Sequence, residues 1–153
     1  MKLLALVSLL CYLSCRVSAD NEFKGLHVFE FNNSTYEVID AYVTWYEANY
    51  ACKLFGMFLV SVETEEEDAA LRQAIVDYVA DDFWTSGNNL FDLGHFYWDT
   101  TGRALGPFTN WAENHPDGGA QNCISLNGSF GHKWTDRFCS NSARFICEKA
   151  PCS

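Results

Sequence analysis

The sequence is short of basic residues and prolines, and beyond its first 19 residues it has no long hydrophobic run. Only 10 lysines and arginines stand against 20 aspartates and glutamates in 153 residues, which gives a formal net charge of -10. Proteins that bind nucleic acids or anionic membranes carry a clustered basic patch, so we exclude both partners. The 3 prolines and the 48% of hydrophobic residues are typical of one folded domain rather than a disordered or collagen-like chain.

Residues 1–19 have the pattern of a secretory signal peptide. Lys2 precedes an apolar run over residues 3–13, and the small or β-branched residues at 17–19 suit cleavage by signal peptidase. The alternative is a membrane anchor, but this run is too short to cross about 30 Å of hydrocarbon. We therefore predict a secreted, extracellular product without membrane insertion.

Cleavage of the signal peptide changes the cysteine count. It removes Cys11 and Cys15 of the 7 cysteines, together with Lys2 and Arg16, so the mature chain is still more acidic. In an oxidising compartment the remaining cysteines predict two disulfides and one additional thiol, and the sequence alone leaves their pairing open. The remaining cysteines are Cys52, Cys123, Cys139, Cys147 and Cys152.

Three sequons for N-glycosylation begin at Asn32, Asn33 and Asn127. Such three-residue motifs also arise by chance, but in a secreted chain they are acceptor sites on surface loops. We predict that at least one carries a glycan, and we interpret residues 20–35 as an N-terminal lead segment.

The spacing of apolar residues predicts a first helix that begins at Thr44. Trp45, Ala48 and Cys52 recur at helical intervals, and Gly56 follows where such a helix would end. Cys52 is therefore expected on the buried face of the helix.

A second helix is expected to begin near Ser61 or Thr64, with a capping box between Thr64 and Glu67. We interpret the acidic run over residues 65–68 as a solvated helix start rather than a calcium cluster, because consecutive helical residues point in different directions. The run also lies at the positive end of the helix dipole. The inward stripe is expected at Leu71, Ile75, Tyr78 and Val79.

After Asp82 the sequence changes to short aromatic, β-favouring segments separated by Gly, Asn and Asp. The stretch between Trp98 and Cys123 is rich in Gly, Asn and Pro and is too long for a simple connection, so we interpret it as a functional loop. Strands are predicted over residues 83–85, 95–98, 123–126, 133–135 and 144–147.

Several motifs occur in the order and at the spacing of one known family. They are Trp45 with Ala48 and Cys52, the Phe-Trp-Thr-Ser-Gly-Asn-Asn run at 83–89, Asn110-Trp111, His115-Pro116-Asp117, Cys123, Lys133-Trp134-Thr135-Asp136, Cys139, and the Arg-Phe-Ile-Cys-Glu run at 144–148. Together they resemble a C-type lectin domain, in the short form of secreted single-domain insect lectins. The resemblance covers residues 36–149 and leaves residues 150–153 as a tail.

The resemblance implies an α+β fold, in which two helices flank small antiparallel sheets and a long loop forms the binding site. It also implies two disulfides, Cys52 with Cys147 and Cys123 with Cys139. In the chain-entropy model the shorter bridge stabilises the fold by about 3 kcal/mol and the longer one by somewhat more.

The resemblance further implies a calcium-dependent sugar site in the long loop. The positions that contact the sugar are matched here by His115, Asp117, Gln121, Thr135 and Asp136, and Pro116 matches a cis-proline. Calcium takes about six to eight oxygen ligands. His115 offers no oxygen, because its side chain is an imidazole. The ring nitrogens of imidazole suit zinc or copper better than calcium. We therefore expect Asp117, Asp136, Gln121 and Thr135 as the metal ligands, with a weak affinity of about 0.1–1 mM or weaker.

The kind of sugar is indicated by the Pro116-Asp117 pair, which resembles the galactose-type pairing of the family more than the mannose-type Pro-Asn pairing. The segment over residues 118–120 lacks an aromatic side chain that would stack on galactose. Trp134 is the nearest candidate, although we expect a tryptophan there to pack in the core. The same expectation holds for Trp45, Trp84, Trp98 and Trp111.

No enzyme is expected from this sequence. Residues 127–131 lack the first glycine of a nucleophile elbow, no His-Glu-x-x-His pair is present, and the four histidines are scattered.

We predict a carbohydrate-binding lectin that recognises glycans or glycoproteins on cells or microbes, in innate immunity. The alternative is a lectin-like domain without calcium or sugar binding that recognises a protein surface. The odd Cys152 predicts a disulfide-linked dimer, which would raise avidity.

Overall fold

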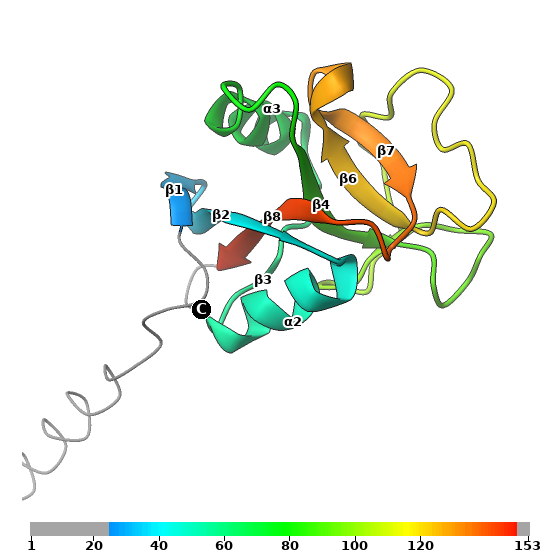
Figure 1. Ribbon diagram of the computed structural model, residues 1–153, viewed down its shortest axis with the longest axis horizontal. Coiled ribbons are helices and arrows are strands. Elements are labelled where there is room, and N and C mark those ends of the chain that lie inside the picture. Colours follow the sequence, from blue (N-terminus) through cyan, green and yellow to red (C-terminus); the bar gives the residue numbers. More distant parts are fainter. Residues whose placement is uncertain (1–24, 150–153) are drawn as a thin grey trace, which may run out of the picture.

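The computed structural model describes residues 25–149, so the predicted signal peptide and Cys152 with its predicted dimer lie outside the described residues. Among the described residues no helix is long and apolar enough to cross a membrane. Figure 1 shows the elements in chain order. They are β1 (Gly25–Phe31), β2 (Ser34–Val43), α2 (Trp45–Leu54), β3 (Phe58–Leu59), α3 (Glu65–Ala74), β4 (Asp82–Asn88), β5 (Tyr97–Trp98), β6 (Cys123–Asn127), the 3-10 turn η1 (Gly128–Phe130), β7 (Lys133–Arg137) and β8 (Ala143–Lys149).

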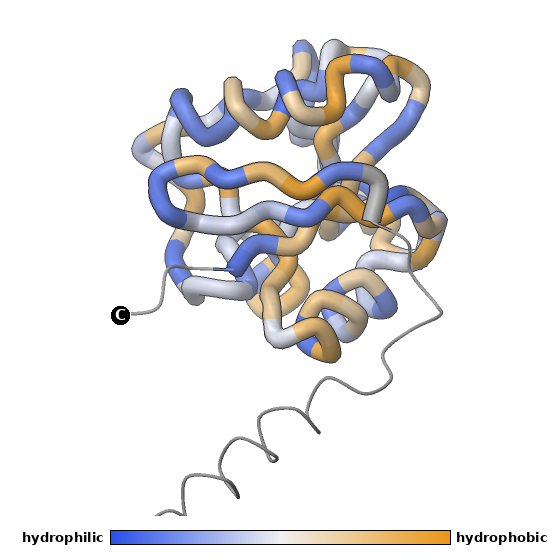
Figure 2. Tube along the Cα trace, turned by 90° about the vertical axis from the view of Figure 1, so that its left-hand side faces the viewer, coloured by the Kyte–Doolittle hydropathy of each residue, from blue (hydrophilic) through white to orange (hydrophobic). Residues whose placement is uncertain are grey.

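All the strands belong to one sheet, with α2 and α3 on opposite sides of it in Figure 1. The hydrogen-bonded order is β1-β2-β8-β4-β6-β7, and β3 and β5 pair with β8 and β4. The small antiparallel sheets expected from the sequence are thus joined, because β4 and β8 pair in parallel at Phe83 with Arg144 and at Trp84 with Phe145. Apolar and polar residues interleave along the strands in Figure 2, as expected for strands with one buried face.

The first helix, α2, confirms the prediction from its spacing. Thr44 is the N-cap and forms a capping box with Glu47, whose carboxylate accepts from the Thr44 backbone N–H at 2.8 Å. Beyond the helix end Gly56 has a φ of 68°, which favours glycine. Trp45, Ala48 and Cys52 are buried, as the spacing predicts.

The second helix, α3, confirms its predicted start and corrects two details. Thr64 accepts from the Glu67 backbone N–H, but the Glu67 carboxylate accepts instead from the Glu63 backbone N–H at 2.9 Å, so the capping box is not reciprocal. Val79 was predicted to face inward, yet it is 68% exposed because the helix ends at Ala74.

The acidic run at the start of α3 is only half solvated. Glu67 and Asp68 are buried, whereas a solvated face was predicted. Both carboxylates are held by partners from distant strands: Glu67 accepts from Tyr36 Oη at 2.6 Å, and Asp68 accepts from Trp134 Nε1 at 2.9 Å. Buried carboxylates of this kind persist because hydrogen bonds compensate for the lost water.

The lead segment contains a strand, β1, that pairs with β2 through a two-residue turn. Asn32 and Asn33 form this turn and both have positive φ, 48° and 65°, a conformation that asparagine tolerates in tight hairpins. Both side chains are exposed, so the turn presents two of the three predicted glycosylation acceptors to solvent.

Two disulfides join the helices and strands as the resemblance implies. Cys52 of α2 is bonded to Cys147 of β8, and Cys123 of β6 is bonded to Cys139 after β7. Both bridges lie in one apolar cluster, which also includes Trp45 of α2. A second apolar cluster lies between α3 and the sheet, next to the long loop. It includes Leu71, Ile75, Trp98, Ile124 and Trp134.

Two carboxyl groups meet between β8 and α3. Ser34 Oγ donates to Glu148 Oε1 at 3.2 Å, next to the bond between Tyr36 and Glu67. Burial, followed by repulsion from Glu67, raises the pKa of Glu148 from 4.5 to about 7.

This pKa shift predicts a pH-dependent stability. Between pH 4.5 and about 7 the unfolded chain releases the Glu148 proton while the folded chain retains it, so stability is complete below this window and falls as pH rises through it. Allowing for partial exposure, the loss is on the order of 1–3 kcal/mol. Glu148→Gln should remove this slope and leave the variant more stable than the parent at pH 8.

The measurement is urea unfolding at intervals from pH 4 to pH 8, expressed as the difference between variant and parent. Glu30→Gln, an exchange on the exposed face of β1, serves as the control. Equal pH slopes for the Glu148 variant and the parent would contradict the assignment.

Candidate functional site

The long loop returns to the sheet beside β7. The backbone N–H of Trp134 donates to the Asn110 carbonyl at 2.9 Å, and that of Ala112 donates to the Trp134 carbonyl at 2.8 Å. The Asn110 amide also donates to Asp68 Oδ2 at 2.8 Å. The buried carboxylate of Asp68 therefore joins α3, the long loop and β7, which places the following loop residues against the end of β7.

Asp136 on β7 receives the tip of this loop. It lies opposite Ile124 of β6, and its side chain points to the other face of the strand from that of the neighbouring Thr135. The Asp136 side chain is completely buried. Asp136 Oδ1 is 2.8 Å from His115 Nδ1 and accepts from the Asp117 backbone N–H at 3.0 Å. Asp136 Oδ2 accepts from the Gly118 backbone N–H at 2.8 Å. One carboxylate thus contacts three residues of the loop.

The loop backbone has the form that these bonds require. The His115–Pro116 peptide bond is cis, as the resemblance implies. Gly118 and Gly119 both have positive φ, 79° and 75°, a conformation that favours glycine. Asp117 itself projects outward, where Gln121 Nε2 donates to its carboxylate.

The structure brings together four of the five residues implied for the sugar site. His115, Asp117, Gln121 and Asp136 share one hydrogen-bonded group. Thr135 does not join it, because its hydroxyl lies on the other side of β7, 3.3 Å from Ser125 Oγ and 3.3 Å from Asn127 Nδ2.

An exposed aromatic ring lies next to this group and was missed in the sequence. Phe130 of η1 is 45% exposed, and its ring centroid is 5.6 Å from that of His115 in an edge-on arrangement. Its proximity depends on the pairing of β6 with β7, which places η1 beside the loop. Trp134, considered as a platform from the sequence, is fully buried, so it packs in the core as expected.

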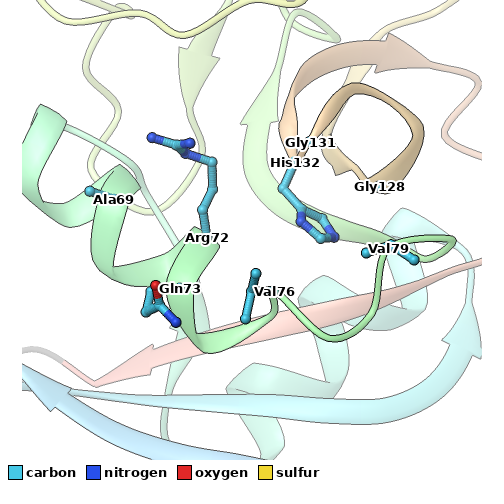
Figure 3. A pocket seen from close by; sticks show the side chains of 8 residues that line it. All are labelled: Ala69, Arg72, Gln73, Val76, Val79, Gly128, Gly131 and His132. Atoms are coloured by element: carbon cyan, nitrogen blue, oxygen red, sulfur yellow. The ribbon is translucent and has the colours of Figure 1, made fainter.

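The cleft shown in Figure 3 lies elsewhere, between α3 and the turn after η1. It has a volume of about 400 Å³ and is lined by Val76, Val79 and His132, among others. Two of its polar groups already have partners: Arg72 Nε donates to Asp68, and His132 Nε2 is 3.1 Å from the Tyr78 carbonyl. Burial lowers the pKa of His132. The residues implied for sugar binding do not line this cleft.

The chain can now be compared with known proteins. The family model described as "Lectin C-type domain" matches residues 41–149. The chain belongs to the C-type lectin domain family. Over 131 residues it is 34% identical to C-type lectin 37Da of Drosophila melanogaster, covering 78% of this chain and 69% of that protein. It is 33% identical over 126 residues to C-type lectin domain family 3 member A of Bos taurus, covering 78% of this chain and 61% of that protein.

Solved structures show the same fold. The mouse scavenger receptor C-type lectin carbohydrate-recognition domain has a TM-score of 0.73 at 21% identity, covering 84% of this chain and 97% of that one. A calcium-independent type II antifreeze protein has a TM-score of 0.70 at 22% identity, covering 86% and 98%. The fold therefore occurs in proteins described as carbohydrate-recognising and in one described as calcium-independent.

C-type lectin domains generally bind calcium, which needs oxygen ligands. The question is whether the side chains at this site offer them. Asp117 and Asp136 are the two carboxylates of the site, and His115 presents a ring nitrogen where calcium needs oxygen. The Thr135 hydroxyl faces another part of the sheet. Gln121 donates to Asp117 through its amide nitrogen. These residues do not fit a calcium site of the usual strength.

The bonds to Asp136 predict the effect of Asp136→Asn. The variant keeps the side-chain shape but replaces one acceptor oxygen with an amide group that cannot accept from the loop. We expect the free energy of unfolding to fall by about 1–3 kcal/mol, and amide exchange at Asp117 and Gly118 to accelerate.

The matched control is Asp92→Asn, since Asp92 also accepts from a histidine and a backbone N–H, but on an exposed turn. It should change stability by less than about 0.5 kcal/mol. Urea unfolding and hydrogen exchange measure both effects. Equal losses in the two variants would contradict the role given to Asp136.

Proposed function

We propose that the chain is a secreted glycan-binding lectin that recognises its sugar at the loop formed by residues 115–121. The observation that carries this proposal is the exposed ring of Phe130 beside the polar group of His115, Asp117 and Gln121. Sugars present hydroxyls around a ring with an apolar face, so an aromatic ring next to hydrogen-bonding groups is complementary to them.

Each side chain of the site has a separate role in this proposal. The exposed carboxylate of Asp117 accepts from sugar hydroxyls, and Gln121 donates or accepts through its amide. Nδ1 of His115 faces Asp136, which leaves Nε2 for a ligand. Asp117 after Pro116 supports a galactose-type preference over a mannose-type one.

Calcium has a minor part in this proposal. The site offers two carboxylates, Asp117 and Asp136, where calcium takes about six to eight oxygen ligands, so we expect a calcium Kd of about 1 mM or weaker. Removal of calcium should therefore change glycan affinity by less than about tenfold.

The family and fold are in general non-enzymatic, and we propose recognition of cell or microbial glycans in innate immunity rather than catalysis.

A second candidate function, recognition of a protein surface, is favoured by a different loop. Phe91 is 92% exposed and Leu93 is 72% exposed at the tip between β4 and β5. A cavity of about 430 Å³ is lined in part by Phe91, His95 and Phe96. Exposed apolar groups gathered in this way mark contact surfaces in many proteins.

The glycan proposal is tested with Phe130→Ala and Asp117→Ala on an array of galactose-terminated and mannose-terminated glycans. Loss of the ring should weaken galactoside binding about three- to tenfold, the range expected for one aromatic contact, and loss of the carboxylate should weaken it further. Phe58→Ala is the matched control. Phe58 is 46% exposed, but it lies on β3, opposite Glu148 of β8, and not on the proposed site.

Parallel arrays with calcium and with EDTA measure the metal dependence. Absence of glycan binding in both would contradict the proposal and favour the protein-surface function. Glycan binding that is abolished in EDTA would contradict the minor part given to calcium.

A further inference from the structure

We propose that His115, Asp117 and Asp136 form a binding site for a transition-metal ion, with Zn²⁺ as the preferred ion, in place of calcium. The site deepens the proposed function, because it lies in the loop that is proposed to recognise glycans. It is, however, assigned from the metal-ligating atoms alone.

The three side chains are already close enough to share one ion. One ligand atom from each lies within 4.8 Å of the other two. In a tetrahedral zinc site with bonds of about 2.0–2.1 Å, neighbouring ligand atoms are about 3.3 Å apart. His115 Nδ1 and Asp136 Oδ1 are 2.8 Å apart, so an opening of about half an ångström admits the ion. Zinc would then replace the proton that the two atoms share.

The electrostatics of the site favour a cation. The Asp136 side chain is completely buried, and among the residues that the structure describes neither lysine nor arginine is paired with it. The groups that contact its carboxylate are His115 and two backbone N–H groups, so the negative charge has no permanently charged partner among the described residues. The bonds from the Asp117 and Gly118 backbones also orient the carboxylate, as the partners around metal ligands commonly do.

The donor types select the ion. Imidazole with two carboxylates is a ligand set suited to zinc, whereas calcium takes only oxygen and needs more ligands than this loop offers. Three protein ligands leave a fourth zinc position open to water or to a ligand hydroxyl. Asp117 is exposed, so that position faces solvent next to Phe130.

The test is a titration of the tag-free secreted protein with ZnCl₂, and separately with CaCl₂, followed by calorimetry. We expect one saturable zinc site per chain, with an affinity at least about 100-fold greater than that for calcium. His115→Gln should weaken zinc binding at least about tenfold, since the loss even of a partner around a metal ligand costs about 10–100-fold. Asp117→Asn, an exposed change that does not threaten folding, should also weaken it.

His95→Gln is the matched control, since His95 forms a similar contact with Asp92, 2.9 Å long, on an exposed turn. Among the residues that the structure describes, no third metal-ligating side chain joins this pair. The zinc affinity of this variant should equal that of the parent. No zinc binding by the parent protein, or equal losses in the His95 and His115 variants, would overturn the proposal. A protein that binds glycans but not zinc overturns only this inference, and one that binds zinc but no glycan overturns only the proposed function.

Discussion

The carboxylate of Asp136 is the constraint on which the long loop depends. A buried negative charge is costly unless hydrogen bonds or a cation compensate for it. Here the loop itself supplies the compensation, through the His115 imidazole and the backbone N–H groups of Asp117 and Gly118. These bonds within the chain fix the shape of the loop, with Gln121 bonded to the exposed carboxylate of Asp117 and the Phe130 ring beside His115.

The predictable parts of the fold are those in which nearby residues determine the structure. The cap at Thr44 and the helical spacing through Cys52 can be recognised within one segment. The strands after Asp82 follow from short aromatic runs bounded by turn residues. The disulfide pairing came from the family resemblance, because spacing alone allowed several pairings.

The parts that escaped prediction depend on partners far away in the chain. Asp68 is buried because Trp134, 66 residues later, donates to it, and no local pattern shows this. Phe130 lies beside His115 only because β6 and β7 pair, so its role becomes visible in three dimensions. Thr135 matches a family position in sequence, yet strand alternation directs its hydroxyl to Ser125.

The most direct test of this account is a crystal structure of the protein prepared in EDTA and then exposed to millimolar calcium. We expect the same loop in both states, with His115 Nδ1 against Asp136 Oδ1 and the N–H groups of Asp117 and Gly118 bonded to that carboxylate. A loop that is displaced without calcium, or calcium bound to Asp136 with His115 moved away, would contradict the role given to Asp136.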